Sequence, residues 1–308
     1  MSDQFHLADD PIALPKGAWA KTERRTLRLG TRPVFSLTQG RHRPYLFPVY
    51  TPAGFAVTSE CPADHPHHNS FWIASDHVDC WMPAAADRKE QYTYNFYVDE
   101  TFQGRAPGRI VQLSAKGQAL DGGRYRITQA IEWRGPLEWA APEGRVAARE
   151  ERVTELGLAG ASYVIDVRST LAAADWDLSL GPTRHAYFNL RLAESIAVTS
   201  GGRVLDDRGR SGGAAVSDGG ARWVDCSGPV GGGHRAGMTL FPDPRDHGDP
   251  FWFVTDWGVV TVGPFRFEKR EIRQGESMTL RYRVLVHDGE PDADEIAAQY
   301  ASYVAALA

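Results

Sequence analysis

The residues best suited to chemistry lie in one short stretch, residues 61–72, which reads CPADHPHHNSFW. Three of the chain's ten histidines, His65, His67 and His68, fall there within four positions, directly after Asp64. Neutral imidazoles bind metals, move protons or donate hydrogen bonds to a ligand oxygen. If the segment continues as a strand after Pro66, His67 and His68 point to opposite faces, and at most two of the three serve one site. The competing interpretation is a polar turn whose imidazoles hydrogen-bond to backbone or water.

The same stretch offers ligands for a metal ion. His65, His67 and His68 are the candidate ligands. The side chains that would complete the set are Asp64, His77, His185 and His287. A divalent ion held with one open position would support lyase, hydrolase or isomerase chemistry. The spacing His-x-His-His is a less specific signal than paired cysteines, so we expect no cofactor, with a divalent metal as the alternative.

A second informative stretch, residues 181–190, reads GPTRHAYFNL. It resembles the segment of aldose 1-epimerases (galactose mutarotases) in which a histidine is followed by a small residue and Tyr-Phe-Asn-Leu. The histidine is the general acid of that family, so the resemblance implies this role for His185. It also implies a sugar substrate and a galactose-mutarotase-like antiparallel β-supersandwich. The Gln-Gly-Glu turn at residues 274–276 is similar to the mutarotase C-terminal region.

Opening a sugar ring needs a base at the anomeric hydroxyl and an acid at the ring oxygen. With His185 as the acid, His67 or His68 would assist it or bind a hydroxyl. The mutarotase base is a glutamate ahead of the C-terminal turn. Asp256 and Glu268 are the acidic residues in that neighbourhood, and neither sits in the family's sequence context. The competing interpretation of His185 is a core histidine that hydrogen-bonds to a backbone carbonyl.

Further residues are predicted to contact the sugar. An arginine would hold sugar oxygens, and a tryptophan would stack on a sugar face. Two polar side chains after His185 would share its strand face, and three polar tips suit a ligand site better than a dry core. The predicted sugar-contacting residues are Arg43, Asp64, Trp72, Tyr187 and Asn189.

A wider resemblance rests on five short segments. They are RPYL at 43–46, DHPHH at 64–68, WVD at 223–225, GPF at 263–265 and VHDG at 286–289. Together they resemble a bacterial family labelled methane oxygenase PmoA, over nearly the whole chain. The histidine motif of that family usually continues with Arg-Gly, whereas Asn69 and Ser70 follow here. Membrane oxygenases need runs of about 18 apolar residues, which this sequence lacks, so the resemblance supports the fold more than the activity.

Composition narrows the class of protein. The 308 residues are 42% hydrophobic and 24% charged, an ordinary globular composition, and we expect one domain over residues 1–308. A net charge of -5 leaves no basic surface for nucleic acid, and no membrane partner is expected. The N-terminus lacks a signal-peptide pattern, and the three cysteines have no CxxC spacing, which predicts reduced thiols and a cytoplasmic location. The sequence does not indicate an oligomeric state.

Short β-type runs separated by turn residues recur along the chain. They are residues 26–29, 34–38, 71–75, 93–98, 109–115, 124–133, 146–156, 162–171, 176–180, 185–190, 237–241, 252–255, 259–262 and 278–287. In 162–171 the predicted inward side chains are Tyr163, Ile165, Val167, Ser169 and Leu171. Residues 43–50 contain two prolines and predict an edge or entry segment, and residues 1–22 and 77–81 predict loops. Frequent strands of this kind predict an all-β antiparallel sandwich.

Two stretches depart from the β pattern. Four glycine clusters interrupt residues 200–236, which predicts a long loop, either a binding lid or a mobile insertion. The one convincing helix follows Asp292, where the sequence resembles a capping box. Its apolar residues Ile296, Tyr300, Val304 and Leu307 recur at helical spacing, so we expect it to pack on the outside of a sheet.

Taken with the resemblances, these features favour a carbohydrate-active enzyme. The expected activity is that of a sugar epimerase or mutarotase-type isomerase with His185 as the general acid. The alternatives are a metal-dependent lyase or hydrolase on a sugar derivative, and a non-catalytic carbohydrate-binding protein. In each case the expected partner is a small-molecule sugar or sugar derivative.

Overall fold

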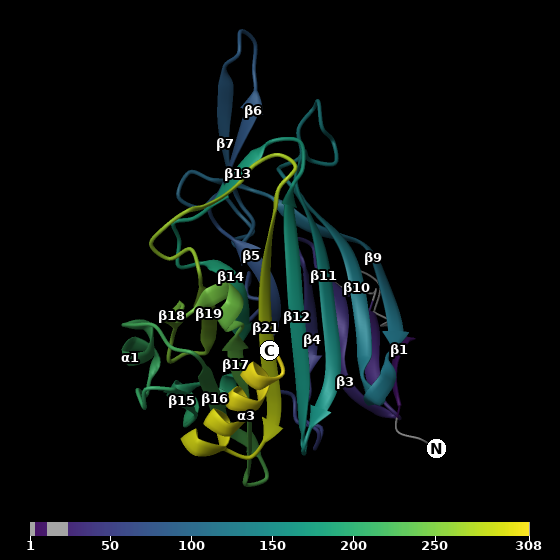
Figure 1. Cartoon of the computed structure of the whole chain (residues 1–308), viewed down its shortest axis with the longest axis vertical. Coiled ribbons are helices and arrows are strands. Elements are labelled where there is room, and N and C mark those ends of the chain that lie inside the picture. The colour runs from purple at the N-terminus through teal and green to yellow at the C-terminus, as the bar shows by residue number, and fades with distance from the viewer. Residues whose placement is uncertain (1–3, 11–23, 308) are drawn as a thin grey trace.

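The structure is a computed structural model that describes residues 4–10 and 24–307. Three sheets dominate the described chain (Figure 1). The first has eight strands, in the spatial order β1 (Phe5–Asp9), β2 (Arg24–Leu29), β3 (Arg32–Gln39), β4 (Pro44–Val49), β5 (Phe71–Ser75), β14 (Ala186–Arg191), β19 (Val259–Gly263) and β18 (Phe251–Val254).

The second sheet also has eight strands, in the order β15 (Arg203–Asp206), β16 (Val224–Gly231), β17 (His234–Pro242), β21 (Ser277–Asp288), β12 (Ser162–Ala173), β11 (Val146–Ala159), β10 (Tyr125–Arg134) and β9 (Arg109–Ala119). The third has five, in the order β20 (Arg270–Ile272), β13 (Asp177–Leu180), β6 (Val78–Pro83), β7 (Lys89–Asn95) and β8 (Ala106–Pro107). Every strand pairing in the described chain is antiparallel except β7 with β8. The predicted all-β antiparallel architecture is confirmed.

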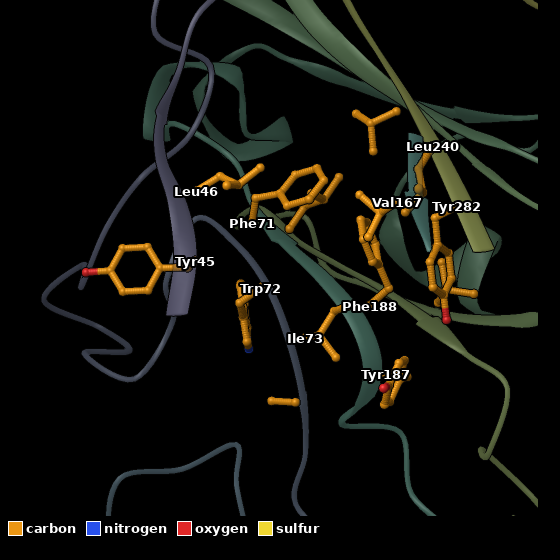
Figure 2. Packing of buried hydrophobic residues seen from close by; sticks show 14 of the residues in the cluster. Tyr45, Leu46, Phe71, Trp72, Ile73, Val167, Tyr187, Phe188, Leu240 and Tyr282 are labelled. Atoms are coloured by element: carbon orange, nitrogen blue, oxygen red, sulfur yellow. The ribbon is translucent and has the colours of Figure 1, made fainter. Parts of the chain in front are cut away.

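The core lies between the two eight-stranded sheets (Figure 2). Phe188 of β14 packs edge-on against Phe71 of β5 at 4.8 Å and stacks on Tyr282 of β21 at 4.3 Å between ring centroids. The inward set predicted for residues 162–171 is buried throughout, as alternation along a strand requires. Burying such side chains contributes about 1.5–3 kcal/mol for each large apolar residue.

The C-terminal helix α3 (Ala293–Ala305) is also confirmed. The Asp292 carboxylate accepts from the backbone N–H groups of Asp294 and Glu295, and the Glu295 side chain accepts from the Asp292 N–H, which completes the capping box. Ile296 and Tyr303 pack against Phe241 on the outer face of the second sheet. The other described helices are the short α1 (Gly213–Ser217) and α2 (Pro244–His247) and the 3-10 turns Asp121–Gly123, Glu194–Ile196 and Val198–Ser200. None of the helices described is long and apolar enough to cross a lipid bilayer.

Two predicted loops are strands. Within residues 1–22, β1 pairs with β2, while Pro11, Pro15 and Gly17 lie outside the described residues. Residues 77–81 fall largely in β6, which pairs with β7 and β13 and buries Val78, Cys80 and Met82. Those three side chains alternate, which is the pattern of a strand with one buried face.

The prediction for residues 43–50 was also wrong, because β4 lies between β3 and β5 rather than at an edge. Its prolines are tolerated for local reasons. Pro44 is the first residue of the strand, and Pro48 lies where the register between β3 and β4 shifts. At neither place does the missing N–H interrupt a regular ladder.

Residues 200–236 do not form the predicted loop, since they contain β15, α1, β16 and the start of β17. The glycines permit close packing there. A Cβ on Gly202 would lie 1.7 Å from the Ile196 carbonyl oxygen, and one on Gly228 would lie 2.7 Å from the Ile196 Cα. These glycines therefore allow β16 to pack against the 3-10 turn Glu194–Ile196. In the sequence alone, the same glycines indicate a loop.

Candidate active site

Four histidines and a tyrosine gather where several connections of the chain meet, and we call this group, His65, His67, His68, Tyr97 and His185, the histidine cluster. The first three lie between β4 and β5, Tyr97 follows β7, and His185 directly precedes β14. The Tyr97 ring centroid lies 5.1 Å from that of His185 and 5.8 Å from those of His67 and His68. The two histidine motifs of the sequence therefore meet around Tyr97, a residue that sequence reasoning missed.

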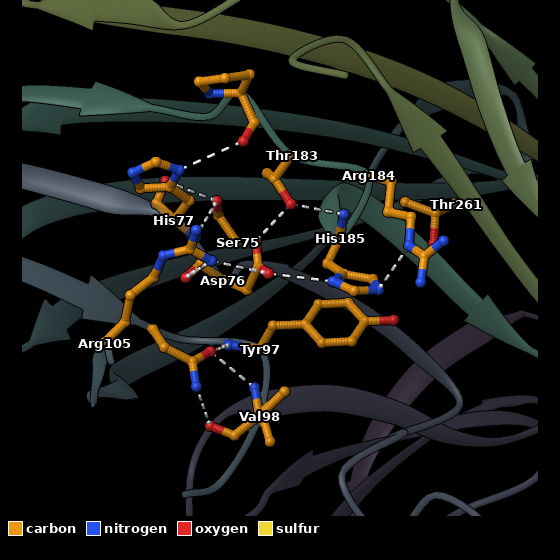
Figure 3. Close-up of polar contacts among 12 residues, drawn as sticks. Ser75, Asp76, His77, Tyr97, Val98, Arg105, Thr183, Arg184, His185 and Thr261 are labelled. Carbon is orange, nitrogen blue, oxygen red and sulfur yellow. Dashed lines mark hydrogen bonds and ion pairs between the residues drawn. The ribbon is translucent and has the colours of Figure 1, made fainter. Parts of the chain in front are cut away.

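A buried carboxylate holds the His185 ring. His185 Nδ1 lies 3.1 Å from Asp76 Oδ2, and Figure 3 shows the contact. The Asp76 side chain is 2% exposed and the His185 side chain 17%. Because a carboxylate accepts from Nδ1–H, it fixes the tautomer in which Nε2 is free to exchange a proton. Asp76 also offsets the positive charge that His185 gains when Nε2 is protonated.

Two more side chains fix Asp76 itself. Thr183 Oγ1 donates to Asp76 Oδ1 at 2.5 Å, and Arg105 Nη1 lies 3.3 Å from Asp76 Oδ2. Burial alone would raise the pKa of Asp76, but the hydrogen bonds from His185 and Thr183 and the charge of Arg105 lower it below its usual range. Asp76 is therefore ionised at neutral pH.

The other nitrogen of His185 faces an arginine. Arg184 Nε donates to His185 Nε2 at 3.3 Å, which agrees with an unprotonated Nε2 (Figure 3). Two phenylalanines border the imidazole, Phe253 at 5.5 Å and Phe102 at 5.9 Å between ring centroids. The exchangeable nitrogen thus lies among apolar rings next to one guanidinium.

On the far side of Tyr97, His67 and His68 are neutral. Burial, followed by the charge of Arg43, lowers the pKa of His67 to about 4. Burial, followed by His67, lowers the pKa of His68 to about 2. His68 Nε2 lies 3.4 Å from the Tyr97 hydroxyl, and burial raises the pKa of Tyr97, so that hydroxyl keeps its proton. Neutral imidazoles and a neutral phenol can donate and accept hydrogen bonds to a hydroxylated ligand.

The backbone at the three histidines is a pair of turns and not a strand. The His65 N–H donates to the Pro62 carbonyl, and the His68 N–H donates to the His65 carbonyl. β5 begins only at Phe71. The expected alternation of His67 and His68 therefore fails, and both rings contact Tyr97.

Arg43 is a structural residue and not the predicted sugar ligand. It is 1% exposed, and all five of its N–H groups are used. Its acceptors are the carbonyls of Phe96, His67 and Tyr97 and the side chains of Asn69 and Asp99, at 2.5–3.3 Å. The guanidinium thereby ties the His67 backbone to the Tyr97 backbone. Asn95, also missed, anchors the same loop by accepting from the N–H groups of Tyr97 and Val98.

Three other predicted sugar contacts are buried. Trp72 is 0% exposed, and its ring centroid lies 5.4 Å from that of His68 and 5.7 Å from that of Tyr97. The Tyr187 hydroxyl lies 2.8 Å from Ser169 Oγ, inside the core. The Asn189 amide is satisfied by the Tyr187 carbonyl and by Thr261, which donates to it at 2.8 Å. Because all three side chains are 0% exposed, no sugar face can reach them in this structure.

Trp257, in the turn between β18 and β19, is a partly exposed aromatic residue. His65 stacks on it with ring centroids 4.3 Å apart, and the Arg191 guanidinium lies 4.7 Å from its ring. Asp64, predicted as a sugar contact, is 45% exposed and accepts two 3.0 Å hydrogen bonds from Arg191 Nη2. His65 Nδ1 lies 3.0 Å from the same carboxylate. Arg191 thus contacts both the Trp257 ring and the Asp64 carboxylate.

The three turn histidines do not form the predicted metal site. The His65 and His68 rings are stacked at 4.8 Å with an interplanar angle of 5°, so their in-plane nitrogens do not converge on one point. His77 contacts the Pro182 carbonyl and Asp79, and His287 pairs with Asp225 on the second sheet. Within the part of the chain that the structure describes, no group of three His, Cys, Asp or Glu side chains is arranged to hold a metal ion.

The two predicted bases, Asp256 and Glu268, do not belong to the histidine cluster. Asp256 Oδ1 accepts from the Gly213 N–H at 2.7 Å and so holds the start of α1. Glu268 is exposed in the connection between β19 and β20. Among the described residues, neither carboxylate forms a hydrogen bond or ion pair with a histidine of the cluster.

Comparisons with solved structures give weak matches. A protein described as Polysaccharide Lyase BACCELL_00875 aligns with a TM-score of 0.36 and 9% identity, over 96% of this chain and 34% of that one. This chain therefore spans about a third of that protein. Slr1438 protein from Synechocystis sp. PCC 6803 aligns with a TM-score of 0.31 and 12% identity, over 91% of this chain and 97% of that one. Such low TM-scores leave the function to be argued from the chain's own residues.

A comparison with curated proteins gave no match. One family does match, over residues 24–301, which include every residue of the histidine cluster and both eight-stranded sheets except β1. The chain belongs to the family described as "Family of unknown function (DUF6807)".

Proposed function

We propose that this protein is a carbohydrate-active enzyme of the epimerase or mutarotase type, in which His185 transfers protons to and from a sugar. The observation that carries the proposal is the Asp76–His185 pair. A buried carboxylate on Nδ1 and a half-buried ring with Nε2 outward is the arrangement of a positioned acid–base histidine.

The second proton-transfer group in this mechanism is His67. Its pKa of about 4 leaves it a neutral acceptor at physiological pH, and it lies across Tyr97 from His185. The base takes the proton of the anomeric hydroxyl, the bond between the anomeric carbon and the ring oxygen breaks, and protonated His185 gives its proton to the ring oxygen. Ring closure on the other face of the aldehyde reverses these transfers and leaves both histidines as they began. Phe253 beside His185 and Trp257 beside His65 are partly exposed aromatic residues at this site.

The test measures anomeric exchange by magnetisation-transfer NMR over a panel of aldoses and hexuronates. His185→Gln should lower the exchange rate by about a hundredfold or more, the usual contribution of a positioned general acid. The matched control is His77→Gln, because His77 is also half-buried and near β5, but its ring nitrogens contact the Pro182 carbonyl and Asp79 and not Asp76. Thermal unfolding of the same preparations separates catalysis from folding.

Two results would refute the proposal. One is a His185→Gln protein that is destabilised but fully active per folded molecule, which would make His185 structural. The other is a wild-type protein that binds sugars without accelerating exchange or any other reaction of the panel, which would favour a non-catalytic carbohydrate-binding protein.

A further inference from the structure

Arg184 has no role in the mechanism above, although it lies on the exchangeable nitrogen of His185. Its Nε donates to His185 Nε2 at 3.3 Å, and its Cζ lies 4.7 Å from the centroid of the Phe253 ring. The residue is exposed. Its neighbours Arg105 and Arg191 are paired with Asp76 and Asp64, whereas no carboxylate of the described chain forms an ion pair with Arg184.

The guanidinium of Arg266, whose charge acts on that of Arg184, also forms no ion pair among the described residues. Arg266 is half-buried, donates to the Trp252 carbonyl at 2.5 Å and lies 5.6 Å from the Phe267 ring centroid. Burial, and then the positive charge of Arg184, lowers the pKa of Arg266. The charge of Asp218 acts on Arg266 in the opposite direction, but among the described residues Asp218 forms no ion pair with either guanidinium. The two like charges therefore create a positive potential, which an anion would relieve.

We propose that the substrate is an anionic sugar whose carboxylate or phosphate group pairs with Arg184, and that this pairing draws the guanidinium off Nε2 of His185. This inference rests on the proposed function, since it assigns the substrate class of the same site. The planar guanidinium presents parallel N–H groups that fit the two oxygens of a carboxylate or phosphate. The positive charge of Arg266 adds to that of Arg184.

The arrangement couples charge recognition to proton transfer. While Arg184 donates to Nε2, that nitrogen's lone pair is occupied and cannot accept a proton. An oxyanion competes for the same guanidinium and forms charge-assisted hydrogen bonds, which are about twice as strong as those between neutral groups. A neutral sugar offers no such competitor, so it leaves His185 in contact with Arg184.

The experiment compares matched pairs of ligands by calorimetry and by anomeric-exchange NMR. The pairs are galactose with galacturonate, glucose with glucuronate, and glucose with glucose 6-phosphate. The variants are Arg184→Gln, which removes the charge, and Arg184→Lys, which keeps the charge but removes the planar fork. Arg88→Gln is the control, because Arg88 is an exposed arginine in the turn between β6 and β7 and its loss changes the net charge equally.

We expect at least one anionic ligand to bind about tenfold or more tighter than its neutral partner, the gain for one charge-assisted pair. Arg184→Gln should abolish this preference, Arg184→Lys should reduce it, and Arg88→Gln should retain it. The ¹⁵N signal of His185 Nε2 should move with the anionic ligand and not with the neutral one. Preference for uronates alone identifies a carboxylate, and preference for the phosphate alone identifies a phosphate ester.

Three results would overturn the inference. A preference that survives in Arg184→Gln removes Arg184 from recognition. Equal binding of both ligands, together with exchange of neutral sugars that depends on His185, refutes the inference and leaves the proposed function standing. Failure of every sugar to bind or react refutes both.

Discussion

Replacing Asp76 by Asn is the sharpest perturbation that the structure offers. The substitution keeps the size of the side chain and removes its charge. Asp76 is 2% exposed and contacts three groups, His185 Nδ1, Thr183 Oγ1 and Arg105 Nη1. An amide in its place can turn its NH₂ toward Nδ1 and so favour the tautomer that carries the proton on Nε2. The neutral amide would also no longer stabilise the imidazolium, the form in which His185 gives its proton to the ring oxygen.

The size of the effect follows from those contacts. Loss of the carboxylate behind an acid–base histidine costs roughly a hundred- to ten-thousandfold in rate, or about 2.7–5.4 kcal/mol of transition-state stabilisation. Stability falls less, because Arg105 is 17% exposed and can turn toward water. We expect a loss of about 1–3 kcal/mol in the free energy of unfolding, the range for a hydrogen bond to a charged group.

The same substitution predicts a pH dependence of stability. The pKa of Asp76 is lowered from 3.8 in the folded state, since the contributions of His185, Thr183 and Arg105 outweigh that of burial. A carboxylate with a depressed folded pKa stabilises the protein above its unfolded pKa, and this contribution is lost as the pH falls through the folded value. The difference in unfolding free energy between wild type and Asp76→Asn should therefore be constant above about pH 5 and shrink below about pH 3.8.

The assay is anomeric exchange at saturating sugar, measured beside urea unfolding of the same preparations. Asp79→Asn is the matched control, because Asp79 is also buried, follows β5 and contacts a histidine, His77, but does not touch His185. It should lose stability and keep its turnover. Asp76→Asn with wild-type turnover per folded molecule would refute the acid–base role of the pair, and equal losses in both variants would mark the effect as structural.

Three further variants test the frame around the site. Arg43→Lys should cost about 3–5 kcal/mol in urea unfolding, because a lysine leaves buried acceptors unpaired; a near-neutral result would contradict the structural role given to Arg43. The pKa values of His67 (about 4) and His68 (about 2) are lowered in the folded state. Between about pH 6.5 and pH 5 both histidines are therefore protonated in the unfolded chain but not in the folded chain. The free energy of unfolding should fall from pH 6.5 toward pH 5 by up to about 1.4 kcal/mol per pH unit for each histidine. His68→Gln should remove about half of that slope in unfolding measured across this range, and an unchanged slope would refute the assignment. Glu150→Gln should destabilise the core by about 3 kcal/mol on thermal unfolding, because it leaves the charge of Arg152 buried without its partner; a smaller loss in 1 M salt buffer than in dilute buffer would instead indicate an exposed pair.

The sequence predicted what depends on local pattern. Alternation from Tyr163 to Leu171 identified the buried face of β12, and the capping box at Asp292 located the start of α3, because each feature is set by neighbouring residues. The place of β4 in the sheet could not be read from two prolines, since their cost depends on where the register shifts. The sequence does not distinguish the exposure of Trp72 from that of Trp257, because packing in the fold buries the first and leaves the second partly exposed.

Some residues of the candidate site could be predicted from local motifs, and others could not. His67, His68 and His185 were found from their motifs, and the structure brings them together around Tyr97. Tyr97 itself follows β7 in a segment with no distinctive spacing, and Asp76 is 109 positions from its partner. One local signal did exist for Asp76, since it is an acid at the end of an apolar strand, where polar residues often mark sites.

The position of the Asp76–His185 pair follows from sheet register and not from loop conformation. β5 and β14 are antiparallel neighbours, and Ser75 lies opposite Ala186. The next residues outward are Asp76 and His185, and the Asp76 N–H donates to the His185 carbonyl at 3.3 Å, which continues the ladder by one rung. A slip of one residue would reverse the faces of β14 and bury polar groups where Phe188 now packs, so the core that fixes the register also fixes the pair. A carboxylate and an imidazole held by a rigid sheet need little reorganisation when a proton moves, which is the condition under which such a pair contributes most to a reaction.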